Sequence, residues 1–224
     1  MLYKKNKVWY NLFGDKVRLK HVKGSADKIN SSDKIIKEPN KYKGNINKIF
    51  KNNNPIHIEI GMGKGNFITE NARLNPNINY IGIEKYDSVI VRALEKEIDL
   101  DNLYLIRMDA TEIENVFEKE IDTVYLNFSD PWPKERHEKR RLSSHTFLKK
   151  YDQIFKNNKH IIMKTDNRKL FEYSVKSFTD YGYKIEKLSL DLYKDDITSN
   201  IPTEYEMKFH SKGFPIYMIE VIKK

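Results

Sequence analysis

The sequence contains no cysteine, and this absence excludes disulfide bonds, thiolate nucleophiles and zinc–thiolate centres. Its six histidines form no pair at the spacing of metal ligands, so we expect no metal site. No apolar run approaches the ~18 residues that a membrane helix needs. The first residues also lack the apolar core of a signal peptide. These absences predict a cytoplasmic protein with no membrane partner.

Acidic residues are scarce in the first quarter of the chain. Residues 1–55 hold 14 Lys and Arg against 4 Asp and Glu, whereas residues 56–224 hold 27 against 28. The net charge of +9 is therefore concentrated in the N-terminal segment. A basic segment beside a nearly neutral body favours a polyanionic partner such as a nucleic acid.

The N-terminal segment also lacks hydrophobic periodicity. We predict that residues 1–50 form a basic, partly flexible extension with short ordered pieces near Trp9 and Phe13. The turn residues "KNNNP" close this extension. The remaining residues, 51–224, are enough for one α/β domain with its own core.

After the extension, strand-like and helix-like segments alternate along the chain. The predicted strands lie at 56–60, 79–84, 103–108, 122–128, 160–165, 183–190 and 216–222. The predicted helices lie at 66–74, 87–98, 143–155 and 168–182. Such alternation predicts an α/β fold with a mostly parallel, doubly wound sheet.

Three glycines, Gly61, Gly63 and Gly65, separate the first predicted strand from the first predicted helix. Glycines at this position let a ligand approach the backbone and the free N–H groups of a helix start. The spacing is G-x-G-x-G and lacks the G-x-G-x-x-G of dinucleotide-binding dehydrogenases. An ordinary tight turn without a ligand is the alternative interpretation.

Acidic residues accompany the first three predicted strands. Glu59 lies just before the glycines, where it would repel a pyrophosphate but attract a cationic group. Glu84 ends the second strand and can accept both hydroxyls of a ribose, and Asp109 can accept from an adenine amine. A ligand that combines adenosine with a cationic tail fits this pattern, which indicates S-adenosylmethionine (SAM).

The stretch "SDPWPKERHEKRRL" follows the fourth predicted strand and combines a carboxylate, Asp130, with a stiff turn and a dense group of cations. Prolines on both sides of Trp132 restrict the backbone of that turn. The cations can neutralise phosphates without reading base sequence. A solvated helix start, and for Trp132 a purely structural plug, are the alternative interpretations.

The motifs "EIGMGKG", "YIGIEKY", "FSDPWPKERHEKRRL", "MKTDN" and "TEYEMKF" resemble, in this order, those of bacterial tRNA (guanine-N7-)-methyltransferases. The resemblance covers about residues 35–222. It implies the Rossmann-like fold of class I SAM-dependent methyltransferases, with a seven-stranded sheet flanked by helices. It also implies SAM as cofactor, tRNA as partner, and methylation of guanine 46 in the variable loop.

The resemblance assigns roles to residues at matching motif positions. With the glycines, it implies a SAM site formed by Glu59, Gly61, Gly63, Gly65, Glu84, Asp109 and Asp130. Asp130 is also the implied catalytic residue. The implied substrate-binding residues are Lys134, Asp166, Thr203, Glu204, Tyr205 and Glu206. The implied RNA-contacting residues are Arg136, His137, Glu138, Lys139, Arg140 and Arg141.

Methylation at guanine N7 needs no general base, because N7 already carries an in-plane lone pair. The enzyme mainly has to align N7 with the methyl carbon and the sulfur. Asp130 can hold guanine through its N1 and exocyclic N–H donors, or it can stabilise the base as it becomes cationic. Asp166 and Glu206 are alternative acceptors for the same donors.

Three rival functions stay open at the level of sequence. The first is a SAM-dependent methyltransferase acting on another RNA or on a small molecule. The second is an RNA-binding module without catalysis, which the acids at three strand ends disfavour. The third is a nucleotide-dependent oxidoreductase, which the glycine spacing and Glu59 disfavour. The sequence leaves the choice between monomer and homodimer open.

Overall fold

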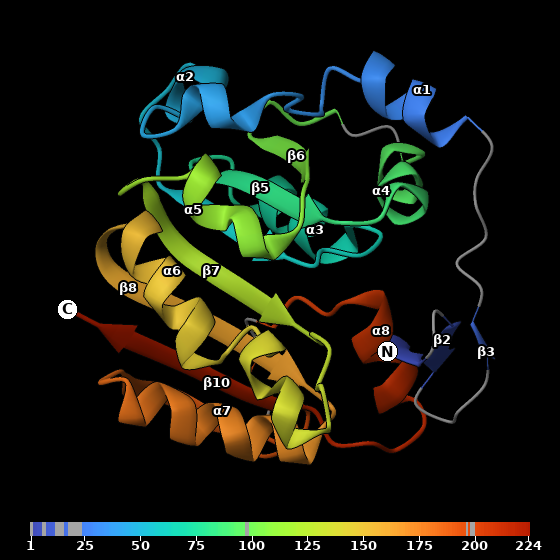
Figure 1. Ribbon diagram of the computed structural model, residues 1–224, viewed down its shortest axis with the longest axis vertical. Coiled ribbons are helices and arrows are strands. Elements are labelled where there is room, and N and C mark those ends of the chain that lie inside the picture. Colours follow the sequence, from blue (N-terminus) through green and yellow to red (C-terminus); the bar gives the residue numbers. More distant parts are fainter. Residues whose placement is uncertain are drawn as a thin grey trace.

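A seven-stranded sheet with the strand order β6-β5-β4-β7-β8-β10-β9 forms the centre of the computed structural model (Figure 1). The structure describes residues 2–5, 8–11, 16–17, 24–96, 99–195, 197 and 200–224. Strands β6, β5, β4, β7 and β8 are parallel, and β10 runs antiparallel to β8 and β9. The strands are β4 (Ile56–Ile60), β5 (Asn79–Glu84), β6 (Leu103–Arg107), β7 (Ile121–Asn127), β8 (Phe155–Thr165), β9 (Lys184–Ser189) and β10 (Tyr217–Lys223).

Helices cover both faces of this sheet. They are α1 (Ser25–Ser31), α2 (Asn47–Phe50), α3 (Asn66–Leu74), α4 (Asp87–Leu94), α5 (Ile113–Val116), α6 (His145–Ile154), α7 (Arg168–Asp180) and α8 (Glu204–His210). Short 3-10 helices are η1 (Pro39–Tyr42), η2 (Ala110–Glu112) and η3 (Glu135–Arg140). In Figure 1, α5 and α6 lie in front of the sheet and α3 lies behind it. The predicted α/β architecture, a mostly parallel seven-stranded sheet flanked by helices, is confirmed.

Two large apolar clusters lie between the sheet and its helices, and a smaller third one joins β10 to α8. Alternate residues of β4 and β5, such as Ile58 and Ile81, join the cluster that contains α5, α6 and α7. The opposite face, including Tyr80 and Tyr125, packs with α1, α3 and α4. The central strands are therefore buried on both sides, as parallel strands usually are. This burial fixes the strand ends at one edge of the sheet.

The observed elements follow the predicted ones closely in the central part of the chain. The helix predicted over 66–74 has these bounds, and the strand predicted at 160–165 begins earlier, at Phe155. Helix α8 and the short helices α1, α2 and α5 were not predicted. They have few turns of their own and depend on packing against the sheet.

The segment before the sheet contributes side chains to both apolar clusters. Ile36 and Ile46 belong to the cluster of β4, and Ile35 bridges to Leu105 of β6. The Phe50 ring meets the Tyr104 ring edge-on, with 5.2 Å between centroids. The predicted domain boundary at residue 50 stays a prediction, and the structure adds that apolar residues before it are part of the core.

Further upstream, strands β1 (Leu2–Lys5), β2 (Val8–Asn11) and β3 (Lys16–Val17) form a separate antiparallel sheet. Of the two ordered pieces predicted here, Trp9 lies in β2. Phe13 lies outside the described residues.

Replacing Phe50 with Ala should lower the free energy of unfolding by roughly 3–5 kcal/mol, because it removes a buried ring from a closed core. The matched control is Leu74→Ala, whose side chain is 61% exposed and whose loss should cost less than about 0.5 kcal/mol. Urea denaturation of the two variants measures both values. Equal effects would show that Phe50 is not part of the cooperative core.

Candidate active site

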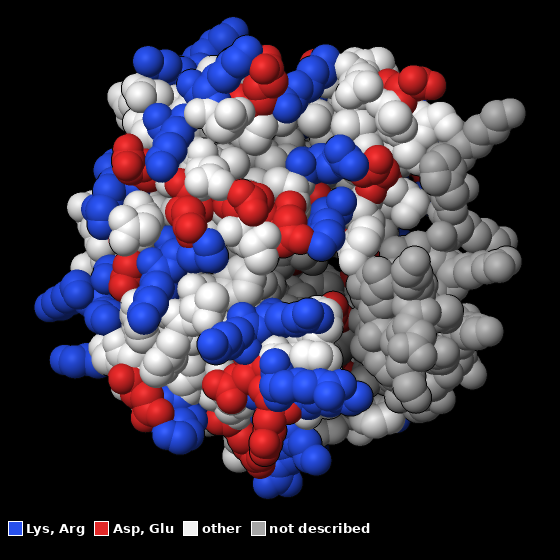
Figure 2. All heavy atoms as spheres, viewed as in Figure 1, with Lys and Arg blue, Asp and Glu red and all other residues white. Residues whose placement is uncertain are grey.

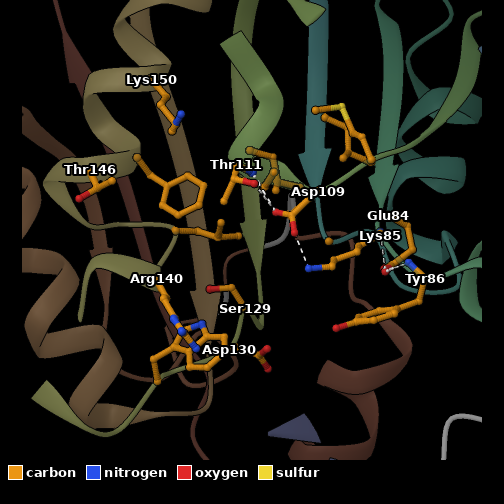
Figure 3. Close-up of a pocket in the computed structure, with 18 of the residues that line it drawn as sticks. Glu84, Lys85, Tyr86, Asp109, Thr111, Ser129, Asp130, Arg140, Thr146 and Lys150 are labelled. Atoms are coloured by element: carbon orange, nitrogen blue, oxygen red, sulfur yellow. Dashed lines mark hydrogen bonds and ion pairs between the residues drawn. The ribbon is translucent and has the colours of Figure 1, made fainter. Parts of the chain in front are cut away.

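A cavity of about 650 Å³ opens at the carboxyl edge of β4, β5, β6 and β7. Its walls include Glu84, Tyr86, Asp109, Asp130 and Arg140. Figure 3 shows Glu84 and Tyr86 on one side of this cavity and Arg140 on the other. The sheet thus brings together acids that are far apart in sequence, because parallel strands end at the same edge.

The glycine turn (residues 61–65) leads into α3, and Gly61 lines the cavity. Gly61, Gly63 and Gly65 have φ values of 78°, 58° and 75°, in the left-handed region that glycine adopts at no steric cost. A Cβ atom at Gly61 or Gly63 would meet nothing within 4 Å, so both face open space. A Cβ at Gly65 would lie 3.1 Å from the Cβ of Ala93, so this glycine permits close packing with α4.

Glu84 ties the glycine turn to the end of β5. Its Oε1 accepts hydrogen bonds from the backbone N–H groups of Lys85 (2.8 Å) and Tyr86 (3.0 Å). Its Oε2 accepts from the N–H of Gly63 at 3.2 Å. Burial raises the pKa of Glu84, and these three donors oppose the shift. Because a carboxylate offers about four acceptor positions, one stays available for a ligand hydroxyl.

Asp109 follows β6 and forms an ion pair with Lys85, which follows the neighbouring strand β5, as Figure 3 shows. Its Oδ1 accepts from the backbone N–H (3.0 Å) and the hydroxyl (2.9 Å) of Thr111, which caps η2. Burial acts to raise the pKa of Asp109, but the bonds from Lys85 and Thr111 hold it below its ordinary value. Asp109 is therefore ionised and fixed in direction.

Asp130 lies just beyond the end of β7, within a backbone that is strained on both sides. Phe128 and Trp132 have positive φ values of 51° and 40°, which bulky residues adopt at a cost of roughly 1–3 kcal/mol each. Burial, with a smaller contribution from Glu84, raises the pKa of Asp130 to about 6. Asp130 is thus a desolvated carboxylate held at the cavity by an unusual turn.

The predicted RNA-contacting cations lie on and beside η3, next to this turn. Arg136 and Lys139 are exposed, and so is the neighbouring Lys134, one of the predicted substrate-binding residues. Arg140 is also exposed and lies over the Trp132 ring, with 4.9 Å from Cζ to the ring centroid. Figure 2 shows Lys and Arg side chains at the rim of the hollow on this face. A phosphate backbone could therefore approach the cavity along a cationic border.

Three neighbours of these cations make intramolecular contacts. The His137 ring meets Trp132 edge-on at 5.7 Å, and Glu138 accepts a hydrogen bond from the hydroxyl of Tyr173 at 3.2 Å. Arg141 is half-buried and donates to two carbonyl groups of the preceding turn. Within residues 136–141, some side chains therefore form a cationic surface, and others make contacts inside the protein.

A second cavity of about 440 Å³ lies between the glycine turn and α8. Its walls include Glu59, Asn127, Thr203, Glu204 and Tyr205. Three buried atoms among these residues have no hydrogen-bond partner within the described part of the chain: Oε2 of Glu59, Oδ1 of Asn127 and Oη of Tyr205. Buried polar groups are normally satisfied, so this wall is chemically suited to a polar or charged ligand group.

Glu59 is a buried acid of the second cavity, with 2% of its surface exposed. Its Oε1 accepts from the amide of Asn127 at 2.9 Å. Burial raises the pKa of Glu59 to about 8, although Asn127 and Lys164 oppose the shift. A cation placed beside Oε2 would favour the ionised form of this carboxyl group.

The predicted substrate-binding residues at the end of the chain have different surroundings. Thr203 caps α8, and Glu204 pairs with Lys64 at 2.9 Å, so both lie beside the glycine turn. Asp166 follows β8; burial raises its pKa, and its Oδ1 has no hydrogen-bond partner among the residues that the structure describes. The position of Asp166 is therefore compatible with its predicted role, which stays a prediction.

Glu206 is fully buried and its two oxygens are already occupied. It accepts from Lys164 at 2.6 Å, from Asn200 at 2.6 Å and from the Tyr193 hydroxyl at 3.1 Å, and it completes the capping box with Thr203. In this structure Glu206 therefore supports α8 and has no acceptor position directed to either cavity.

The sequence-based set missed Lys85, Asn127 and Lys164. Lys164 is 3% exposed and lies within β8, where it donates to Asn200, Ile201 and Glu206. The available signal for this buried cation was a lysine that directly follows the apolar residues Ile161, Ile162 and Met163. The signals for Lys85 and Asn127 were weaker, because a polar residue at a strand end is common.

Within the described ranges, none of the helices has the length and apolarity needed to cross a membrane. Among the same residues, no group of three or more His, Asp or Glu side chains is arranged to hold a metal ion.

Solved structures with the same fold include several methyltransferases. One is described as an antibiotic-related methyltransferase, with a TM-score of 0.59, 16% identity, and coverage of 80% of this chain and 92% of the other. A 16S ribosomal RNA methyltransferase gives a TM-score of 0.57 at 12% identity, with coverage of 80% and 92%. At such low identity, these matches show the fold alone.

Sequence comparison gives much closer relatives. A family model described as "Putative methyltransferase" matches residues 53–219. A tRNA (guanine-N(7)-)-methyltransferase of Lachnoclostridium phytofermentans is 49% identical and covers 93% of this chain and 99% of its own length. The enzymes of the same name from Bacillus velezensis and Listeria monocytogenes are 52% and 51% identical, and each covers more than nine-tenths of both chains. This chain belongs to the family of tRNA (guanine-N(7)-)-methyltransferases.

Proposed function

We propose that this protein transfers a methyl group from SAM to N7 of a guanine in tRNA, and that the target is guanine 46 of the variable loop. The observation that carries the proposal is Asp130, a desolvated carboxylate held in a strained turn between a cavity lined by acids and a cationic border. The names of the close relatives support the reaction and the substrate class. Position 46 rests on the resemblance of the motifs.

The residues at the cavity fit the cofactor. Glu84 keeps an acceptor position for a ribose hydroxyl, and Asp109 is ionised beside the path of an adenine amine. Open space at Gly61 and Gly63 lets the cationic tail of SAM pass close to the protein backbone. The unpartnered Oε2 of Glu59 suits the cationic tail. When bound, SAM supplies a methyl carbon activated by its sulfonium charge.

Asp130 and its neighbours orient the base. The carboxylate can accept from the N1 and exocyclic N–H groups of guanine, and its negative charge opposes the positive charge that develops on the base. Asp166 and Tyr205, each with an unpartnered buried oxygen, are further groups for the substrate. No residue has to remove a proton from N7, so catalysis consists of alignment and electrostatic stabilisation.

The exposed cations beside the Pro-Trp-Pro turn (residues 131–133) bind the RNA backbone. Lys134, Arg136, Lys139 and Arg140 present their charges next to the cavity mouth, where they can neutralise phosphates. Such contacts place the tRNA without reading its bases, and the base is selected inside the cavity. A cytoplasmic location follows from this substrate.

Labelled methyl groups from SAM should appear in unmodified tRNA transcripts incubated with the protein, and chemical cleavage at N7-methylguanine should map them to position 46. A transcript with adenine at position 46 is the control and should stay unlabelled. Label at another atom or another nucleotide would contradict the proposed target. Label in a small molecule but not in tRNA would contradict the proposed substrate class.

Asp130→Asn should reduce the single-turnover rate at saturating SAM by about 10²-fold or more, by analogy with the loss of one preorganised polar contact. The substitution should not lower the free energy of unfolding. Folding raises the pKa of Asp130 from 3.8 to about 6, so the ionised carboxylate lowers the free energy of unfolding above pH 6, and the amide removes this cost. Near-normal methyl transfer by Asp130→Asn would exclude this role for Asp130. Asp166 would then be the remaining acidic candidate for orienting the base.

The same carboxylate predicts the pH dependence of kcat/KM for tRNA. Because Asp130 binds a proton as the pH falls through about 6, kcat/KM should decrease below this pH. The decrease should be absent from the residual activity of Asp130→Asn. An identical acid limb in both proteins would assign it to another group.

Glu84→Ala should weaken SAM binding by roughly 2–3 kcal/mol, the upper range for a hydrogen bond to a charged group. The change removes the ribose acceptor and the bond that holds Gly63. The matched control is Glu112→Ala, an exposed acid of η2 whose loss should not change affinity. Calorimetric titration gives both values, and unchanged affinity in Glu84→Ala would remove this residue from the site.

A further inference from the structure

We propose that Arg141 is a positioning residue that fixes the Pro-Trp-Pro turn, and through it the place of Asp130, and that it does not serve as a phosphate contact. The inference rests on the proposed function, because it concerns the carboxylate assigned to the reaction. It separates Arg141 from the exposed cations with which it is grouped in the sequence.

The guanidinium group of Arg141 is committed to the turn. Its Nε donates to the carbonyl of Pro131 at 3.1 Å, and its Nη2 donates to the carbonyl of Trp132 at 3.2 Å. The planar arrangement of these donors matches two neighbouring carbonyls, a geometry that a lysine ammonium does not reproduce. The bonds reach the first two residues after Asp130.

The ring of Tyr173 packs against the guanidinium group of Arg141. The Cζ atom of Arg141 lies 4.2 Å from the centroid of the Tyr173 ring on α7. The hydroxyl of Tyr173 donates to Glu138, which places a carboxylate at the edge of this stack. Arg141 is half-buried as a result, whereas Arg136 and Arg140 are exposed.

The backbone of this region is anchored to α7 by buried serines. The hydroxyl groups of Ser143 and Ser174 lie 2.6 Å apart, and Ser177 donates to the carbonyl of Ser143 at 2.7 Å. The N–H of Ser144 donates to the carbonyl of Arg141 at 2.9 Å. Arg141 therefore connects a rigid helix to the turn.

The turn needs such an external support. Pro131 and Pro133 have no backbone N–H, so the turn has lost two donors that could hold it locally. Trp132 has a φ of 40°, and a strained residue keeps such a conformation only when its surroundings enforce it. The two carbonyl bonds from Arg141 act on the strained residue and on the proline before it.

The test is Arg141→Lys, which keeps the charge but removes the planar fork and the stacking face. The single-turnover rate at saturating SAM and tRNA should fall about ten- to hundredfold, the effect of misplacing a reacting group. The affinity for tRNA and its salt dependence should change less than about twofold. Arg73→Lys, the same change at an exposed arginine of α3, is the matched control and should keep full activity.

A second readout does not depend on the reaction. The chain has two tryptophans, so Trp9→Phe leaves Trp132 as the sole tryptophan, whose fluorescence can be excited selectively and reports on the turn. In this background, Arg141→Lys should make Trp132 more accessible to acrylamide quenching. Arg136→Ala is the contrasting variant, because it should lower the tRNA affinity and its salt dependence without changing the quenching.

Two outcomes would overturn the proposal: an unchanged saturated rate in Arg141→Lys, or a loss of tRNA affinity with an unchanged Trp132 signal. If Arg141→Lys does not fold, Tyr173→Leu is the substitute variant, because it removes the ring that packs against Arg141. It should also lower the saturated single-turnover rate and increase the quenching of Trp132, each by a smaller amount. Wild-type protein that methylates no tRNA would refute the proposed function, while the quenching comparison would still decide the role of Arg141.

Discussion

Burial of negative charge at the carboxyl edge of the parallel sheet is the constraint on which the rest of the site depends. The strands bring Glu59, Glu84 and Asp130 to one edge, and burial raises the pKa of each. The surroundings compensate in different ways. Backbone N–H groups bind Glu84, Asn127 binds Glu59, and Lys85 faces Asp109. Glu84, Glu59 and Asp109 are thereby held in one direction, which suits a ligand with several donors and a cationic tail.

Left-handed backbone conformations occur at two places in the site, the glycine turn and the turn around Asp130, and their energetic costs differ. In the glycine turn they cost little, and the absence of side chains leaves room for a ligand. Around Asp130 they fall on Phe128 and Trp132 and store strain. Strain of this kind persists only in a rigid environment, and the buried sheet and α7 provide that environment. The site thus combines a permissive glycine turn with an enforced turn that holds Asp130, the carboxylate proposed to act on the base.

The buried pair Lys164–Glu206 joins the far part of the chain to the sheet. Lys164 donates to Asn200 and Glu206, so both the loop before α8 and the helix itself are tied to β8. A buried ion pair adds little net stability, because both charges lose their hydration. Its effect is positional: it holds Thr203 and Tyr205 at the second cavity.

The sequence by itself determined the central strands, the glycine turn and the acids at the strand ends, because periodicity and turn residues are local signals. It also placed Asp130 beside a stiff turn, since Pro131 and Pro133 constrain their own backbone. It could not show that Glu206 is fully occupied or that Arg141 differs from Arg140. Those properties depend on partners such as Lys164 and Tyr173, which lie 42 and 32 positions away along the chain. Only tertiary packing decides which charged groups are buried, since desolvation and partner choice are set by neighbours brought together in folding.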